Sequence, residues 1–245
     1  MRSLIPQRIP QIPESRLILY SLIEEENKSQ ARLAKTDDGR SWLLKSSMRS
    51  PEILAESLGW LLSRRLNVPT PDGAVTTHSG KPAWLSAYIG QIDYWDAKKM
   101  SAIHNITEIG SMLALDALLY NEDRHHKNIL LEPDPDEYRV KAWSIDLADA
   151  EIGRPEGIKR VALDLPRAVY IARGIPLDVT RDQALVTADL AAQLNPKDLR
   201  EDVVEACGLA SEAKVDVLYD ALLRRFQNAR TLVEKYLSAY SEVVE

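Results

Sequence analysis

Eight consecutive polar residues, Asn121 to Asn128, follow a long apolar stretch and precede a short β-prone run. Within them Asp123 and Asn128 are five positions apart, and Asp146 follows 18 residues after Asn128. A carboxylate that accepts a hydroxyl proton, with an amide and a second carboxylate that bind Mg²⁺, is the set of groups that phosphoryl transfer needs. We therefore expect these three side chains to converge.

A lysine and a glutamate upstream complete this set. Lys45 ends the β-prone segment Ser41 to Lys45, and Glu56 follows 11 residues later in a predicted helix. In phosphoryl transfer a strand lysine contacts the α- and β-phosphates and a helical glutamate holds it. Glu52 lies one turn before Glu56 on the same helical face, so it is an alternative partner for the lysine.

The elements that must position these side chains change in type along the chain. Residues 16–90 are predicted to be mainly β with one helix, and residues 95–245 mainly helical. Strands are expected at 17–23, 31–36, 41–45, 74–77 and 83–89, and a hairpin over 129–145. The order of strands and turn residues indicates an antiparallel meander.

Several helix boundaries can be predicted from capping residues. The helix that carries Glu56 should have Ser50 as its N-cap and end by Asn67, and a helix over 107–120 should be buried on all sides. Further caps are expected at Thr180, Asn195 and Ser211, with a last helix from about 212 to 243.

The residues Asn121-x-Asp123-Arg124-His125-x-x-Asn128, followed by Trp143-Ser144-Ile145-Asp146, resemble the catalytic loop and metal-binding aspartate of HipA-like kinases. They are more distantly similar to phosphatidylinositol 3/4-kinases. Ordinary protein kinases place His-Arg before the catalytic aspartate, whereas here Arg-His follows it. Residues 43–45 resemble the nucleotide-binding strand of the family, residues 56–71 its Glu-bearing helix and the exit of that helix, and residues 85–89 its adenine hinge. The whole resemblance covers about residues 16–150.

This resemblance implies an α+β, bilobal, protein-kinase-like fold. Residues 1–89 would form a small antiparallel β N-lobe with one helix, and residues 90–245 a mainly helical C-lobe with the catalytic loop and the metal-binding hairpin. By its size the chain is similar to the short HipA-like kinases.

The resemblance also implies ATP and Mg²⁺ as cofactors and a role for each site residue. Asp123 would position the substrate hydroxyl, Asn128 and Asp146 would hold Mg²⁺, and His125 would brace the loop by a hydrogen bond. The remaining contacts to the nucleotide would come from Lys45 and Glu56 at the phosphates, Ala87 and Ile89 at adenine, and Lys28 and Ser29 in the phosphate-covering segment.

Two segments depart from the family pattern. Leu147-Ala148 follow the metal-binding aspartate in place of a Phe-Gly or His-Gly pair. The stretch 24–30 should cover the phosphates, but it contains three glutamates and no glycine, and acids beside a triphosphate are unfavourable. A pseudokinase or nucleotide-binding partner module is therefore an alternative to a protein Ser/Thr kinase. A kinase for a lipid or another small molecule is a third reading.

Composition limits the partners. With 31 Lys and Arg against 37 Asp and Glu the net charge is −6, which disfavours nucleic acid as a partner. The single cysteine excludes an intramolecular disulfide. The longest apolar stretch is too short to cross a bilayer, so we expect a cytoplasmic protein without membrane contact. The resemblance to HipA-like kinases implies a protein substrate that bears a Ser or Thr hydroxyl, a target in the translation machinery and an antitoxin partner.

Overall fold

The computed structural model describes residues 8–22, 31–46, 48–90, 93–134, 138–167 and 172–244. Its first half is a five-stranded antiparallel sheet with the strand order β1-β2-β3-β5-β4. The strands are β1 (Leu17–Leu22), β2 (Arg32–Thr36), β3 (Ser41–Lys45), β4 (Gly73–His78) and β5 (Lys81–Ala87), and helix α1 (Ser50–Arg65) connects β3 to β4. Strands β1, β2 and β3 form a meander, as predicted, whereas β5 lies between β3 and β4.

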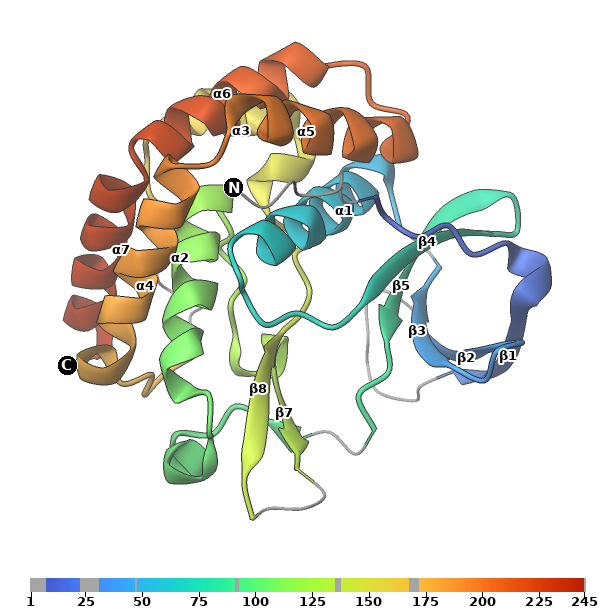
Figure 1. Cartoon of the computed structure of the whole chain (residues 1–245), viewed down its shortest axis with the longest axis horizontal. Coiled ribbons are helices and arrows are strands. Elements are labelled where there is room, and N and C mark those ends of the chain that lie inside the picture. The colour runs from blue at the N-terminus through green and yellow to red at the C-terminus, as the bar shows by residue number, and fades with distance from the viewer. Residues whose placement is uncertain are drawn as a thin grey trace.

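The sheet curls until the chain entering β1 meets its far edge. Gln11 forms a parallel bridge with Val75 of β4, while β1 pairs with β2, so one continuous segment contacts both edges (Figure 1). A turn of 3-10 helix, η1 (Glu14–Arg16), joins the two parts. The interior holds mostly small side chains around Trp42, which leaves room at one end of the curl.

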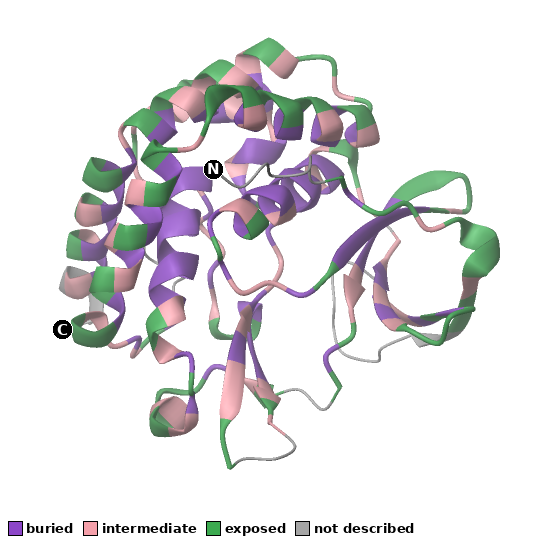
Figure 2. Ribbon diagram, in the orientation of Figure 1, coloured by how far each residue is buried: buried purple, intermediate pink, exposed green. Residues whose placement is uncertain are grey.

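The second half is mainly helical, as expected. It contains α2 (Ile109–Leu119), α3 (Pro155–Val161), α4 (Leu177–Ala192), α5 (Pro196–Ala210), α6 (Val215–Gln227) and α7 (Ala229–Val244). Every residue of α2 is buried, because α4, α6 and α7 pack around it and it runs through the middle of this lobe (Figure 2). The apolar composition of 109–119 on all sides is thereby explained.

A small second sheet lies beside α2 and carries the polar loop. Strands β6 (Asp93–Tyr94), β7 (Ile129–Pro133) and β8 (Val140–Ser144) pair in that order. The short 3-10 segments are η2 (Ala97–Ala102), η3 (Ile106–Glu108), η4 (His126–Asn128) and η5 (Glu151–Gly153). Since β7 starts at Ile129 and β8 ends at Ser144 directly opposite, the hairpin returns the chain to the end of the polar loop.

Three boundary predictions are wrong. The N-cap of α1 is Arg49 and not Ser50, because Glu52 bonds back to the Arg49 amide at 2.6 Å. Thr180 lies inside α4, where its hydroxyl donates to the Pro176 carbonyl at 2.8 Å, whereas Asn195 caps α5 as predicted.

The single helix predicted over 212–243 is in fact two. Ser211 ends α5 in the left-handed conformation, and Asn228 closes α6, where its side-chain amide donates to the Arg224 carbonyl at 2.8 Å. Asn often competes with helical backbone hydrogen bonds in this way. No helix among the described residues is long and apolar enough to span a membrane.

Helix α1 is anchored to the helical lobe by a buried ion pair. Arg65, at the end of α1, contacts Asp202 of α5 through two hydrogen bonds of 2.6 and 2.8 Å. Only 3% of the Arg65 side chain and 1% of the Asp202 side chain are exposed. This pair fixes the helix that carries Glu56 against α5.

We expect Asp202→Asn to lower the free energy of unfolding by about 2–3 kcal/mol, because it leaves a buried guanidinium without its main partner. The loss is limited because Asp198 remains 3.6 Å from Arg65. Urea unfolding measures it. Asp189→Asn, which removes an exposed partner of Arg230, is the matched control. Equal midpoints for the two variants would show that the buried pair does not anchor α1.

Candidate active site

A cleft lies between the curled sheet and the β7–β8 hairpin. The residues that line it come from β3, α1, the exit of α1, β5 and the segment after β8, and they are Leu43, Lys45, Glu56, Trp60, Thr70, Pro71, Trp84, Ser86, Ala87, Ile89, Leu130, Ser144, Ile145, Asp146 and Leu147. The part bounded by the described residues has a volume of about 50 Å³, far below the roughly 300–1,000 Å³ of typical small-molecule sites.

Lys45 bridges two carboxylates at the base of the cleft. Its Nζ lies 2.6 Å from Glu56 Oε1 and 3.0 Å from Asp146 Oδ1. Burial opposes the charge of the ammonium group, but the carboxylates of Asp146 and Glu56 outweigh it and hold the pKa of Lys45 above its ordinary value. The lysine is therefore a fixed cation at neutral pH.

The structure distinguishes between the two glutamates of α1. Glu52 accepts hydrogen bonds from the Arg49 amide and side chain at 2.6 and 2.7 Å, so it serves the start of the helix. Glu56 points to Lys45, and its other oxygen accepts from the Leu147 amide at 3.4 Å. Glu56 thus contacts both the strand lysine and the residue after Asp146.

Two glycines let α1 approach the segment after Asp146 closely. A Cβ on Gly59 would lie 2.4 Å from Leu147 Cδ1, and a Cβ on Gly153 would lie 2.1 Å from the Pro51 carbonyl oxygen. A Cβ at position 153 would meet backbone and push the helix away, whereas a Cβ at position 59 would force the Leu147 side chain to move. The middle and the start of α1 are both in direct contact with this segment.

Asp146 has an unusual backbone conformation and a stabilised charge. Its φ is 60°, in the left-handed region that non-glycine residues rarely adopt. Burial raises the pKa of the carboxyl, but Lys45 and the Ala148 amide outweigh this and keep the pKa below its ordinary value. Asp146 is therefore ionised at neutral pH.

The polar loop orients Asn128. The Asn128 side-chain amide donates to the Asp123 carbonyl oxygen at 2.5 Å, which leaves the side-chain oxygen as its acceptor for a cation. The Ile145 amide donates to the Asn128 carbonyl at 3.2 Å, so Asn128 lies beside the residue that precedes Asp146. The structure brings Asn128, Asp123 and Asp146 to one end of the hairpin.

Arg124 and Asp116 hold this arrangement, and sequence reasoning missed the arginine. The Arg124 guanidinium forms two 2.8 Å bonds to the Asp116 carboxylate, and neither residue is exposed to solvent. Its third nitrogen donates to the carbonyls of Asn128 and Ile145 at 2.7 and 2.9 Å. One buried side chain therefore ties the polar loop to the residue before Asp146.

Asp116 also fixes the beginning of the loop. It accepts a 2.7 Å hydrogen bond from the Asn121 side chain, whose oxygen accepts from the Asp123 amide at 3.2 Å. The sequence signal for this cluster was Asp116, which lies in the middle of a predicted buried helix, five residues before Asn121 and eight before Arg124. A buried carboxylate needs charged or amide partners, and these two residues can supply them.

His125 does not brace the loop as expected. Its Nε2 lies 3.8 Å from Asp123 Oδ2, too far for a hydrogen bond, and its Nδ1 has no partner among the described residues. The bracing comes from Arg124. With 40% of its side chain exposed, His125 stands next to the Asp123 carboxylate at the surface of the site.

The adenine-contact residues are only partly as expected. Ala87 and Ile89 both line the cleft, but the Ala87 amide donates to the Asp72 carbonyl at 2.7 Å. Any hydrogen bond between Ala87 and a base would therefore use the Ala87 carbonyl as acceptor. Lys28 and Ser29 lie outside the described residues.

The donor set fits a magnesium ion bound together with a nucleotide. Mg²⁺ is usually held by one or two protein oxygens, with phosphates and waters completing its coordination. Asp146 supplies an ionised carboxylate and Asn128 an amide oxygen, and no cluster of three or more metal-binding His, Cys, Asp or Glu residues occurs in the described ranges. The phosphates themselves would supply the remaining ligands.

No family model and no curated protein matches this sequence. Among solved structures, the Helicobacter pylori proinflammatory kinase CtkA is similar over 92% of this chain and 99% of its own, with 10% identity and a TM-score of 0.65. HipA of Shewanella oneidensis, solved with HipB and operator DNA, covers 93% of this chain and 65% of its own, with 12% identity and a TM-score of 0.47. LepB of Legionella pneumophila has 13% identity, coverages of 81% and 46%, and a TM-score of 0.49. At such identities the comparison concerns the fold alone, and only the score of CtkA is high enough to support it. This chain has a bilobal, kinase-like fold.

Proposed function

We propose that this protein is an ATP- and Mg²⁺-dependent kinase. The observation that carries the proposal is the position of Lys45, which contacts Glu56 at 2.6 Å and Asp146 at 3.0 Å within a kinase-like fold. A lysine held by a helical glutamate beside a metal-binding aspartate is what phosphate positioning in kinases requires. In our proposal residues 1–89 form the nucleotide-binding lobe and residues 90–245 the catalytic lobe.

Each polar side chain has one task in the proposed reaction. Lys45 neutralises the α- and β-phosphates, and Glu56 keeps it in place. Asn128 and Asp146 would hold Mg²⁺, which when bound would neutralise charge between the phosphates. Asp123 accepts a hydrogen bond from the substrate hydroxyl and aligns it with the γ-phosphorus. His125, adjacent to Asp123 and partly exposed, meets the transferred phosphate.

The substrate we propose is a Ser or Thr hydroxyl of a protein. The support is the order Asp123-Arg124-His125 and Asn128, which resembles the HipA-like catalytic loop. The same resemblance supports a cytoplasmic kinase with an antitoxin partner and a target in translation. A kinase for a lipid or small molecule of the same fold is the rival within this class.

A nucleotide-binding pseudokinase is favoured by one feature of the sequence. The stretch 24–30, which should cover the phosphates, contains three glutamates and no glycine, and acids beside a triphosphate are unfavourable. A protein that uses nucleotide only as a structural ligand would show raised thermal stability with ATP and no turnover.

We expect the wild-type protein to release or transfer label from γ-labelled ATP in the presence of Mg²⁺, and Asp123→Asn to abolish this. Label is measured both on protein and as free phosphate, with a cell lysate as acceptor. Asp134→Asn, a change in the β7–β8 turn, is the matched control and should retain activity. If ATP raises the melting temperature of both wild type and Asp123→Asn but neither turns it over, the pseudokinase takes the place of the kinase.

A further inference from the structure

A second cavity opens at the end of the curled sheet. It lies where the N-terminal segment, the β2–β3 turn, the start of β4 and the end of α1 meet, and its volume is about 350 Å³. The residues that line it are Pro10, Gln11, Ile12, Arg16, Thr36, Asp38, Arg40, Trp42, Trp60, Arg64, Asp72 and Gly73. This volume falls in the usual range for small-molecule sites, and it is several times that of the cleft at Lys45.

The floor of this cavity is apolar and aromatic. Trp42 lies in the interior of the curl and is 3% exposed, and Trp60 faces the cavity from α1. Ile12 and Pro10 complete this surface. Two indoles and two aliphatic residues provide a surface for a flat, apolar group of a ligand.

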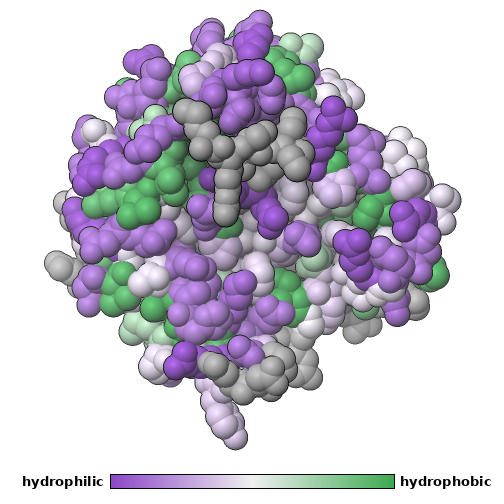
Figure 3. Space-filling model, in the orientation of Figure 1, coloured by the Kyte–Doolittle hydropathy of each residue, from purple (hydrophilic) through white to green (hydrophobic). Residues whose placement is uncertain are grey.

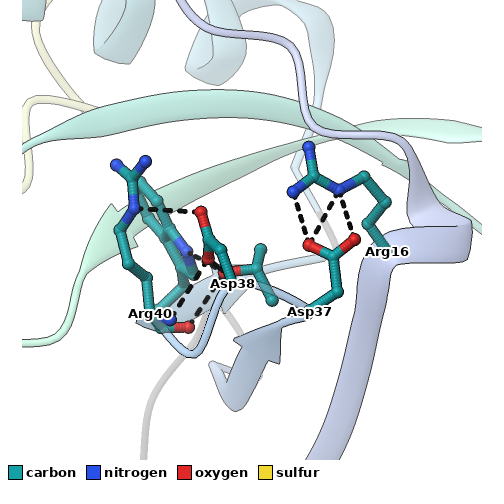
Figure 4. Close-up of polar contacts among 6 residues, drawn as sticks. Arg16, Asp37, Asp38 and Arg40 are labelled. Carbon is teal, nitrogen blue, oxygen red and sulfur yellow. Dashed lines mark hydrogen bonds and ion pairs between the residues drawn. The ribbon is translucent and has the colours of Figure 1, made fainter.

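The rim carries charges of both signs. Arg40 Nε lies 3.2 Å from Asp38, and Arg64 lies 3.8 Å from Asp72, while Arg16 is bound by Asp37 outside the cavity. Figure 4 shows Arg16 and Arg40 on either side of the turn, and side chains over this end of the sheet are mostly hydrophilic (Figure 3).

In these ion pairs several N–H groups of the arginines have no hydrogen-bond acceptor among the described residues. The terminal nitrogens of Arg40 and the Nη1 of Arg16 make no hydrogen bond to another described residue. The pairs at Arg40 and Arg64 are long and exposed, and such pairs contribute little to stability. A ligand can therefore add charge-assisted hydrogen bonds at the rim.

We propose that this cavity binds a small zwitterion with an aromatic body, of the chemical class of the aromatic amino acids. Its carboxylate binds the guanidinium groups of Arg16 and Arg40, its ammonium binds Asp38 and Asp72, and its ring lies against Trp42 and Trp60. An anion alone would face the two aspartates, and a cation alone would face the three arginines. Only a molecule with both charges matches the rim.

The cavity shares a wall with the cleft at Lys45. Trp60 lines both, and its indole donates to the Pro71 carbonyl at 3.0 Å. Asp72 lines the cavity, and its carbonyl accepts from the Ala87 amide in the cleft. Where the cleft binds nucleotide as proposed above, occupation of the cavity changes nucleotide affinity, and nucleotide changes ligand affinity by the same factor.

The test uses the full chain and three probes: L-phenylalanine, 3-phenylpropionate and 2-phenylethylamine. We expect L-phenylalanine to bind with 1:1 stoichiometry by calorimetry, and each of the other two, which lack one charge, to bind about tenfold or more weakly. In ¹H–¹⁵N spectra the indole signals of Trp42 and Trp60 should shift, whereas that of Trp143, on β8, should not.

Variants locate the site independently of any enzymatic activity. Arg40→Gln and Asp72→Asn should each weaken L-phenylalanine binding about tenfold or more, whereas Arg230→Gln, at an exposed pair on α7, should not change it. The proposal is overturned if phenylpropionate binds as tightly as phenylalanine, if Arg40→Gln and Asp72→Asn bind normally, or if no indole signal shifts at millimolar ligand. An unchanged affinity for an ATP analogue in the presence of bound phenylalanine would overturn the linkage to the cleft.

Discussion

Replacing Asp146 by asparagine is expected to lower the rate of phosphate transfer by about 10²- to 10³-fold, because removing one electrostatic contact to the reacting group typically costs roughly 3–4 kcal/mol of transition-state stabilisation. The amide keeps the size of the side chain but loses the negative charge that holds Mg²⁺. Lys45 retains Glu56 at 2.6 Å, so the lysine should still meet the phosphates.

The measurement is the turnover of γ-labelled ATP alongside ATP affinity with and without Mg²⁺. Loss of the metal ligand should weaken affinity in Mg²⁺ and leave the metal-free affinity near that of the wild type. Asp149→Asn is the control, since Asp149 is an exposed carboxylate three residues later. A variant at position 146 that keeps wild-type turnover would contradict the metal role of Asp146.

Arg124→Lys is expected to destabilise the protein by about 3–5 kcal/mol, the range for breaking a buried ion pair. Lysine cannot reproduce the fork of hydrogen bonds that joins Asp116 to the carbonyls of Asn128 and Ile145, although it keeps the positive charge. For a chain of this size the melting temperature should fall by roughly 6–20 °C.

The catalytic consequence of this change is separate from the loss of stability. At a temperature where the variant is fully folded, turnover should still fall, because the polar loop and the residue before Asp146 have lost their common donor. Arg230→Lys, at an exposed pair, should change neither quantity measurably. A melting temperature of Arg124→Lys equal to that of the wild type would mean that the loop is held by other contacts.

The fold could be predicted from the sequence where local patterning and burial agree. The β2–β3 turn chemistry, the alternation in β3 and the predominantly apolar α2 each specify one structure, and all three occur. The break at Asn228 could not be predicted, because an asparagine inside an amphipathic stretch is compatible with one helix or two. Its effect depends on packing against other helices.

The charged residues of the candidate site could be predicted from the sequence, but the contacts that hold them in place could not. Glu52 is not the partner of Lys45 because it binds Arg49 at the start of the helix. The sequence Ser50-Pro51 indicates an N-cap at Ser50 instead, so this contact of Glu52 could not be predicted. Arg124 was overlooked because, in sequence, an arginine beside a catalytic aspartate usually indicates a surface contact with phosphate. Its burial follows only from the position of Asp116 in the middle of α2.

The close approach of α1 to the segment after Asp146 has a consequence for control of the proposed enzyme. Many kinases are switched off by swinging the glutamate-bearing helix outward, which separates the glutamate from the lysine. Here Gly59 lies against Leu147, Gly153 lies against Pro51, and Asp202 holds the far end of the helix. With α1 held at its start, middle and end, an outward movement of this helix would have to break all three contacts before it could separate Glu56 from Lys45.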